Sequence, residues 1–371
     1  MSGPSKLKVQ NTKKILSILL KNKVATRQML IEHTGLAAST VSMISGELLK
    51  AGLIREAGFM SGGGAGRRTQ VLKRNPKAGY VITVFVTPEE VAVGLFDFSY
   101  STVDIIRYEY EESFREDEST QLVQGVEALL ERNKIGKKLK AICLALPTYP
   151  FDVAAIKRVF EAQFSAPVLL VNNVEAIALS EYYHQLHTEY NTIAYVYIGT
   201  GIGSALVLDG ELYKGASGHA SDLGHTGVVP NGSKCRCGRI GCLETKAAEW
   251  AISNMLEQEL GEKVGSKFNT VRILKKEFDA GSDTAVRIVE EAAMYFGKAL
   301  YNLAAVIDPE AIFISGRMEA LNPIFSSKVE QAYLDLAKFN PNKIVPLKFI
   351  PLHRESGNEG AAIYSFLQVY C

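Results

Sequence analysis

The chain has 371 residues, of which 47% are hydrophobic and 22% are charged, a composition typical of globular proteins and not of disordered ones. Its length exceeds that of one ordinary hydrophobic core and predicts two or three domains. No apolar run reaches the roughly 18 residues of a membrane span, and the N-terminal sequence lacks a signal-peptide core, so we expect a cytoplasmic protein with reduced thiols and no membrane partner.

The net charge of +1 conceals a basic and an acidic part of the chain. Residues 1–75 contain 13 lysines and arginines against three acidic residues, a balance of +10, whereas the remaining residues carry −9. A basic segment joined to an acidic body predicts a module that binds a polyanion. A solvated surface is the alternative that charge alone leaves open.

The basic segment is predicted to contain a helix-turn-helix. A first helix is expected to begin near Asn11, a suitable N-cap, and Thr26 is expected to cap a second, short helix that Gly35 ends. A third helix over residues 38–50 follows directly. The second and third helices match the helix-turn-helix arrangement, in which the later helix enters the major groove.

The third helix is expected to bury Val41, Ile44 and Leu48 and to expose the opposite face. That exposed face offers small hydroxyl side chains and no arginine or asparagine for bidentate base recognition. Phosphate contacts are therefore expected to supply most of the DNA affinity, and a few base contacts and groove shape are expected to supply the sequence preference. The DNA contacts that we predict from this helix are Ser39, Thr40 and Ser42.

A β-hairpin wing is predicted after the third helix. The extended runs A-G-L-I-R-E-A-G-F-M and T-Q-V-L-K-R flank a glycine-rich tip that carries Arg67 and Arg68. Paired arginines suit the negative potential of a narrow minor groove, so we predict that both contact double-stranded DNA. A small helical dimerisation bundle is the alternative, but it explains neither the basic charge nor the arginine tip.

The remaining chain is expected to form a duplicated α/β body. Three strands between residues 80 and 110 precede alternating helices and strands, and the same pattern restarts near residue 192. Such a repeat predicts two lobes with a cleft between them. The predicted domains are residues 1–75, 76–190 and 191–371. Predicted helices lie near 119–134, 152–163, 174–187, 246–260, 283–307 and 320–337.

Three of the five cysteines lie within eight residues. Cys235, Cys237 and Cys242 follow the C-x-C-x4-C spacing, and His225 precedes the first of them by ten residues. Three thiolates and an imidazole form a tetrahedral Cys3His set, which predicts one structural Zn2+ per chain. Buried reduced cysteines are the alternative, but glycine, arginine and lysine surround this group.

The body resembles the ROK family, whose name stands for repressor, open reading frame and kinase. The strongest match is G-H followed by C-R-C-G-R-I-G-C-L-E, and weaker matches are G-T-G-I-G, I-S-G-R-M and G-A-A-I. The resemblance implies the two-lobed sugar-kinase, actin-like fold of the ribonuclease H type. With the winged helix in front, the domain order is similar to that of the family's xylose-repressor-like transcription factors.

The resemblance implies a sugar site. Glu244 matches the family's sugar-binding glutamate, His225 lies beside the same sugar, and Asn172 matches the asparagine of an Asn-Asp pair. Asp222 stands where the family has a glutamate, so its carboxylate is one methylene shorter. Asn173, in place of the aspartate of that pair, is expected beside the ligand as a hydrogen-bonding amide.

The same resemblance indicates that phosphoryl transfer is lost. The family's kinases use the aspartate of the Asn-Asp pair as the base, and an amide at Asn173 cannot accept a proton near neutral pH. The family's phosphate-binding D-x-G-G-T is F-V-T-P-E-E here. We therefore predict a sugar-responsive DNA-binding regulator, a repressor that acts as a homodimer or dimer of dimers. The alternatives are a residual or bifunctional sugar kinase and a DNA-binding regulator that has lost ligand sensing.

Overall fold

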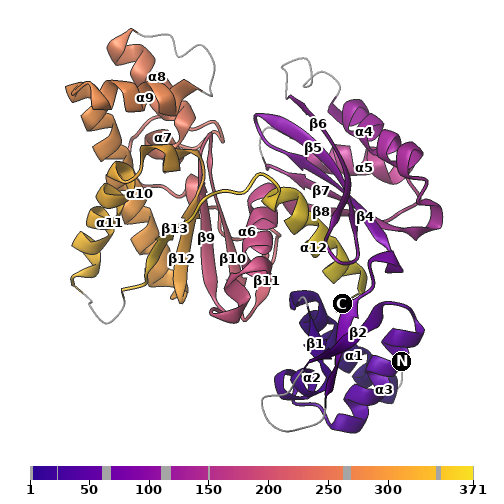
Figure 1. The fold of residues 1–371 in the computed structure, drawn as a ribbon. Helices are drawn as coiled ribbons and strands as arrows, with labels where there is room; N and C mark the ends of the chain where they lie inside the picture. The colour runs from indigo at the N-terminus through magenta and orange to yellow at the C-terminus, as the bar shows by residue number, and fades with distance from the viewer. Residues whose placement is uncertain are drawn as a thin grey trace. The chain divides into compact units, whose positions relative to one another are not determined.

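The computed structural model describes residues 3–22, 24–60, 68–109, 118–148, 151–261, 269–339 and 344–370. The chain divides into two compact units (Figure 1). Unit 1 consists of residues 1–185 together with 355–371, and unit 2 consists of residues 186–354. The chain therefore leaves unit 1 once and returns to it at its C-terminal end.

The predicted helix-turn-helix is confirmed in unit 1. Thr26 caps α2 by accepting a hydrogen bond from the backbone N–H of Met29 at 3.2 Å, and Gly35 ends this helix with a φ of 66°. The start predicted at Asn11 is wrong, because Asn11 lies inside the first helix. The apolar period marks only the part of that helix that packs on the core, and the polar turns before it are also helical. The three helices are α1 (Gly3–Lys21), α2 (Arg27–Thr34) and α3 (Ala38–Lys50).

The predicted wing is also confirmed as an antiparallel hairpin. Strands β2 (Ile54–Met60) and β3 (Thr69–Arg74) pair with each other, and β1 (Ala25–Thr26) pairs with the other edge of β3. The hairpin tip, which includes Arg67, lies outside the described residues. A small core of this domain is formed by Ile15, Leu16, Leu19, Leu30, Val41, Ile44, Leu48, Ile54 and Leu72.

The α/β part of unit 1 is built on a five-stranded sheet of order β6-β5-β4-β7-β8. The first three strands are antiparallel, and the last two run parallel to β4. Side chains of α4 (Glu118–Asn133) and α5 (Val153–Gln163) form one core with alternate residues of this sheet. The strands are β4 (Tyr80–Val86), β5 (Glu90–Asp97), β6 (Thr102–Glu109), β7 (Leu139–Leu146) and β8 (Val168–Asn172).

The C-terminal helix α12 (Ser356–Tyr370) belongs to unit 1, although the sequence boundaries placed it with the second lobe. It packs against α6 (Asn173–His184) and against β4. A Cβ atom at Gly360 would lie 1.6 Å from the carbonyl oxygen of Ala176, so only glycine allows this close approach. The weak G-A-A-I match thus lies on a helix whose glycine is required by packing.

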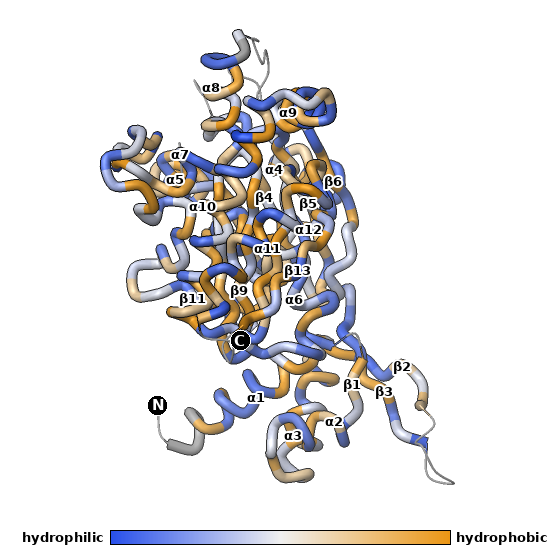
Figure 2. The backbone as a smooth tube through the Cα atoms, turned by 90° about the vertical axis from the view of Figure 1, so that its left-hand side faces the viewer, coloured by the Kyte–Doolittle hydropathy of each residue, from blue (hydrophilic) through white to orange (hydrophobic). Residues whose placement is uncertain are grey.

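Unit 2 repeats the same topology, with a sheet of order β11-β10-β9-β12-β13. Three antiparallel strands are again followed by strands parallel to the first, which confirms the predicted duplication. The strands of both sheets are mainly hydrophobic (Figure 2). The strands are β9 (Ile193–Ile198), β10 (Ile202–Leu208), β11 (Glu211–Tyr213), β12 (Ala311–Ser315) and β13 (Leu347–Phe349).

The helices of unit 2 differ in part from the predictions. The helix expected near 246–260 is divided at Ala248, whose ψ of 149° is extended, and the helix expected near 320–337 begins only after Pro323. Among the described residues, no helix is long and apolar enough to cross a membrane. The helices are α7 (Glu244–Ala247), α8 (Glu249–Leu260), α9 (Thr270–Asp279), α10 (Asp283–Ile307) and α11 (Ile324–Ala337).

Candidate functional site

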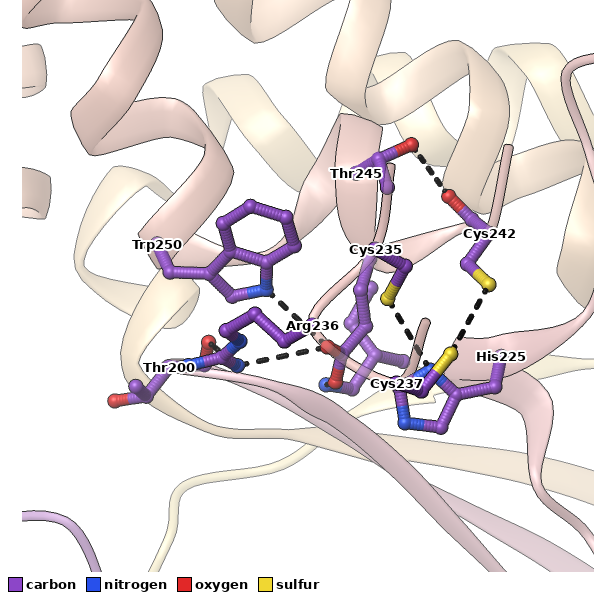
Figure 3. A network of polar contacts seen from close by, with 10 residues as sticks. Thr200, His225, Cys235, Arg236, Cys237, Cys242, Thr245 and Trp250 are labelled. Atoms are coloured by element: carbon purple, nitrogen blue, oxygen red, sulfur yellow. Dashed lines mark hydrogen bonds and ion pairs between the residues drawn. The ribbon is translucent and has the colours of Figure 1, made fainter. Parts of the chain in front are cut away.

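The structure brings the histidine and the three clustered cysteines together in unit 2. The ligand atoms of His225, Cys235, Cys237 and Cys242 all lie within 4.8 Å of one another (Figure 3). Cys235 Sγ is 3.6 Å from His225 Nδ1, and Cys237 Sγ is 3.7 Å from Cys242 Sγ. Four convergent donors of this kind can hold a metal ion.

The loop that carries these ligands depends on its glycines. Gly238 and Gly241 have φ values of 90° and 75°, which other residues rarely adopt. A Cβ atom at Gly241 would lie 1.8 Å from the carbonyl oxygen of Val229. Gly224, which precedes His225, lies against the backbone of Ile202 in the same way. The glycines of the motif therefore allow the chain to fold tightly around the four donors.

The three thiols differ in acidity. Burial raises the pKa of Cys235, and it raises the pKa of Cys242 to about 12. Burial also acts on Cys237, but hydrogen bonds from the backbone and side chain of Arg239, together with those of the Cys235 and Cys242 thiols, outweigh it and lower the pKa of Cys237 to about 7. A guanidinium beside one ligand thus favours the thiolate form that a metal ion requires.

Glu244 is buried in unit 2, with 6% of the residue exposed. Its Oε1 accepts a hydrogen bond from the backbone N–H of Ile202 at 2.8 Å, and its Oε2 accepts one from Trp250 Nε1 at 3.2 Å. The guanidinium of Arg236 lies 3.5 Å from the same Oε2. The Glu244 carboxylate is therefore hydrogen-bonded to the G-T-G-I-G turn between β9 and β10.

Asp222 differs from Glu244 in exposure. Its side chain is 52% exposed, and its Oδ2 accepts a hydrogen bond from Arg239 at 3.3 Å. The same Arg239 contacts Cys237, so a single guanidinium connects the metal cluster with Asp222. In unit 2, the residues predicted from the ROK motif are accordingly joined through arginines that the sequence analysis did not single out.

Asn172 and Asn173 lie in unit 1, at the start of α6. Asn172 is the N-cap, and its side-chain oxygen accepts a hydrogen bond from the backbone N–H of Val174 at 2.9 Å. Its Nδ2 donates to Thr148 Oγ1 at 3.2 Å. The side-chain oxygen of Asn173 lies 3.0 Å from the same Val174 N–H. Both asparagines are partly exposed at the carboxyl end of β8.

The F-V-T-P-E-E segment, predicted to stand in place of the family's phosphate-binding motif, forms a turn whose amides bond within the turn. The hydroxyl of Thr87 accepts hydrogen bonds from the backbone N–H groups of Glu89 and Glu90 at 3.2 and 3.1 Å. Thr87 N–H donates in turn to the carbonyl oxygen of Glu90, and Pro88 has no N–H to donate. The backbone amides of Thr87, Glu89 and Glu90 therefore all donate hydrogen bonds within the turn itself.

The predicted DNA-binding residues that are described lie on the surface of the N-terminal domain. Ser39 and Ser42 are exposed on α3, and Thr40 is half-buried beside them. Arg68 is exposed at the start of the segment that leads into β3, while Arg67 lies outside the described residues. Lys8 and Glu47 form an exposed ion pair of 2.7 Å that joins α1 to α3.

Together, these elements define a winged helix-turn-helix domain joined to a duplicated, sugar-kinase-like α/β body with a Cys3His cluster. The chain belongs to the ROK family, whose sequence profile matches residues 122–365. A second profile, described as winged helix-turn-helix DNA-binding, matches residues 10–55.

Similar proteins include both transcriptional regulators and a sugar kinase. The chain is 27% identical over 333 residues to the xylose repressor of Bacillus subtilis strain 168, which covers 86% of this chain and 85% of the repressor. The structure of a ROK family transcriptional regulator, a homologue of the E. coli MLC protein, covers 97% of this chain and 96% of its own with a TM-score of 0.75 and 21% identity. The ROK hexokinase from Thermus thermophilus covers 78% of this chain and 99% of its own, with a TM-score of 0.66 and 27% identity.

Proposed function

We propose that this protein is a sugar-responsive transcriptional repressor that binds a double-stranded DNA operator. The observation that carries the proposal is the fusion of a winged helix-turn-helix to a ROK body in one chain. Residues 1–75 form the proposed DNA-binding domain. Residues 76–185 with α12 form the first proposed lobe of the sensor, and residues 186–354 form the second. The name of the Bacillus subtilis relative supports repression in response to a sugar.

We propose that Ser39, Thr40 and Ser42 contact the major groove and that Arg67 and Arg68 contact the backbone or the minor groove. The side chains on the exposed face of α3 are small, so this helix can approach base edges closely. The wing supplies positive charge. A homodimer, or a dimer of such dimers, would place two winged helices on a palindromic operator with half-sites about 10 bp apart or a multiple of that.

The metal that we propose for the cluster is a single structural Zn2+. Zinc–sulfur bonds of about 2.3 Å and zinc–nitrogen bonds of about 2.0 Å in a tetrahedron imply separations of about 3.8 Å between sulfurs and about 3.5 Å between sulfur and nitrogen. The observed separations of 3.7 and 3.6 Å agree with this donor set. His225 Nδ1 faces Cys235, so His225 Nε2 lies on the other side of the ring and can donate to a sugar.

The ligand that we propose is a sugar or sugar derivative. Asp222, His225 and Glu244 of unit 2, with Asn172 and Asn173 of unit 1, supply the carboxylates, imidazole and amides that pair with sugar hydroxyls. A ligand can control DNA binding only if it prefers one conformation of the protein over another.

We propose that the body does not transfer phosphate. Asn173 cannot act as a base, and Glu175, the nearest carboxylate along the chain, caps α6 with 5% of the residue exposed. The Thr87 hydroxyl uses two amides of the turn that replaces the phosphate-binding segment. The similarity to a hexokinase structure makes residual kinase activity the competing function, and a regulator without a ligand is the third.

Thermal-shift screening of the purified full-length protein against sugars and sugar phosphates tests this function. We expect at least one sugar to raise the melting temperature and to change the affinity for operator DNA. Sugar-dependent ADP release from ATP would favour the kinase instead. Tight DNA binding together with no response to any compound would favour the regulator that has lost its ligand.

A further inference from the structure

Arg236 lies between two residues of the metal cluster, Cys235 and Cys237. Cys235 is 3% exposed, and its backbone N–H donates to the carbonyl oxygen of Arg239 at 2.8 Å. The position from which the Arg236 side chain extends is therefore determined by the fold of the metal loop. A metal ion bound to both flanking thiolates would further restrict the motion of this backbone.

The Arg236 guanidinium points away from the cluster, toward the turn between β9 and β10 (Figure 3). It donates a hydrogen bond to the carbonyl oxygen of Thr200 at 3.3 Å and lies 3.5 Å from Glu244 Oε2. It also lies over the ring of Trp250, 4.8 Å from the centroid. One side chain thus connects the metal loop with the turn, with the buried carboxylate and with the indole.

Glu244 and Trp250 depend on this connection. The Glu244 side chain is 7% exposed, so its negative charge requires donors within the protein. Those donors are the backbone N–H of Ile202, the indole N–H of Trp250 and the Arg236 guanidinium. Removal of one donor from a buried carboxylate leaves the remaining contacts to reorient it.

We propose that Arg236 is a positioning residue that transmits the metal state of the Cys3His loop to Glu244. This inference rests on the proposed function, in which the loop binds zinc and Glu244 binds a sugar. With metal bound, the loop holds the guanidinium against Glu244 and Trp250. Without metal, the loop relaxes, and the carboxylate loses its charged partner.

Trp250 makes the proposal measurable, because it is the only tryptophan in the 371-residue chain. Its ring lies under the guanidinium, and its N–H donates to Glu244, so its emission reports on both groups. The experiment uses the full-length protein and Zn2+ alone as the probe. Zinc is removed with a chelator and added back, while tryptophan emission, bound zinc and far-ultraviolet circular dichroism are recorded.

Three proteins are compared with wild type. Arg236→Met keeps an apolar side chain and removes every donor, and Arg236→Lys restores a positive charge. Lys234→Met is the matched control, since Lys234 lies in the same loop, is exposed, and carries the same charge. We expect Arg236→Met to bind one zinc and to lose the zinc-dependent change in emission. Arg236→Lys should recover part of that change, and Lys234→Met should retain it.

The outcomes separate this inference from the proposed function. If Arg236→Met binds zinc and keeps the wild-type change in emission, Arg236 does not connect the two sites. This inference is then wrong, and the proposed function is unaffected. If the wild type binds no zinc, both the metal assignment and the inference fail. Absence of any sugar response leaves the zinc experiment decisive, because that experiment uses no sugar. A variant that unfolds is recognised by circular dichroism, and Arg236→Lys then decides the result in its place.

Discussion

Glu175 and Asn172 cap the start of α6 reciprocally. The Glu175 carboxylate accepts a hydrogen bond from the backbone N–H of Asn172 at 3.0 Å, while the Asn172 side chain accepts from the first turn of the helix. This capping box assigns Glu175 a structural task and leaves it 5% exposed. The one carboxylate near Asn173 in sequence is therefore held away from the role of a base.

We predict that the substitution Asn173→Asp does not create a sugar kinase. The new carboxylate would supply a base, but Thr87 would still occupy the amides of Glu89 and Glu90, and both acids would still repel ATP. ADP release with hexoses, pentoses and N-acetylhexosamines should remain at background for the wild type and the variant. An active ROK hexokinase is the positive control. Clear sugar-dependent turnover by the wild type would favour the kinase over a repressor without phosphoryl transfer.

The metal cluster leads to a stability prediction. Cys237→Ser should lose the single zinc and destabilise the protein by several kcal/mol, roughly a third of the ~10–16 kcal/mol that zinc contributes in isolated fingers. Elemental analysis and chemical denaturation of reduced protein measure both effects. Cys371→Ser is the matched control for loss of a thiol and should keep its zinc. Wild-type protein without zinc after purification in reducing buffer would contradict the assignment.

Signals confined to a few neighbouring residues were sufficient for much of the fold. The Thr26 cap, the Gly35 helix terminus and the spacing of the cysteines each involve residues that are close together in the sequence. Each of them predicted its element or cluster correctly. The duplication of the body was also visible, because its strands and helices recur in the same order. Such features depend on local backbone geometry and on hydrophobic period.

Contacts between distant segments could not be predicted in this way. Nothing in residues 356–370 indicates that the helix packs with α6 some 180 residues earlier rather than with unit 2. Arg236 resembled any charged residue in a loop, and its contacts with Thr200 and Trp250 arise only after both segments fold. The spacing of the cysteines predicted the four donors, and the resemblance to the ROK family indicated Glu244, but tertiary structure was needed to find the side chain between them.

Asp104 and Arg132 provide a pH-dependent prediction for unit 1. The side-chain hydrogen bond from Arg132 is the main cause that lowers the pKa of Asp104 to about 2, and Asn133 adds a second bond. Because this pKa lies below the ordinary value of about 3.9, the pair stabilises the folded state fully above that pH and progressively less as the pH falls toward 2.

Arg132→Met should therefore lower the free energy of unfolding at pH 7 by a small amount typical of partly exposed pairs. The difference from wild type should shrink as the pH falls from about 4 to about 2. Urea denaturation across this range measures it, with the exposed Lys138→Met as a control for loss of charge. A difference between Arg132→Met and wild type that does not change with pH would show that Asp104 is not the linked group.

The wing should contribute through charge. Replacement of Arg67 and Arg68 by alanine should weaken operator binding and reduce the slope of log K against log salt concentration by about 2, since each arginine contributes about 0.9. Fluorescence anisotropy at several salt concentrations measures the slope. The double variant Lys137→Ala and Lys138→Ala, which removes equal charge from an exposed turn of the α/β part, is the control. Unchanged affinity in the arginine variant would refute the wing contact.

The last prediction concerns the path from ligand to DNA. Glu244→Gln preserves the shape of the side chain and an oxygen for the Ile202 N–H, but it places an amide N–H2 opposite the donors of Arg236 and Trp250. We expect the effector-dependent change in operator affinity, about 5- to 150-fold for a coupling of roughly 1–3 kcal/mol, to be lost. Operator binding without effector should stay close to wild type, because α3 lies in unit 1 and Glu244 in unit 2.

Operator affinity measured with and without the sugar from the thermal-shift screen tests this prediction. His225→Ala is the informative comparison, since it removes a metal donor as well as a ligand contact and should lower stability in addition to the response. Glu244→Gln should abolish the response with zinc still bound. If the response survives this substitution at wild-type size, Glu244 serves only the G-T-G-I-G turn, and the effector must act through other residues of the body.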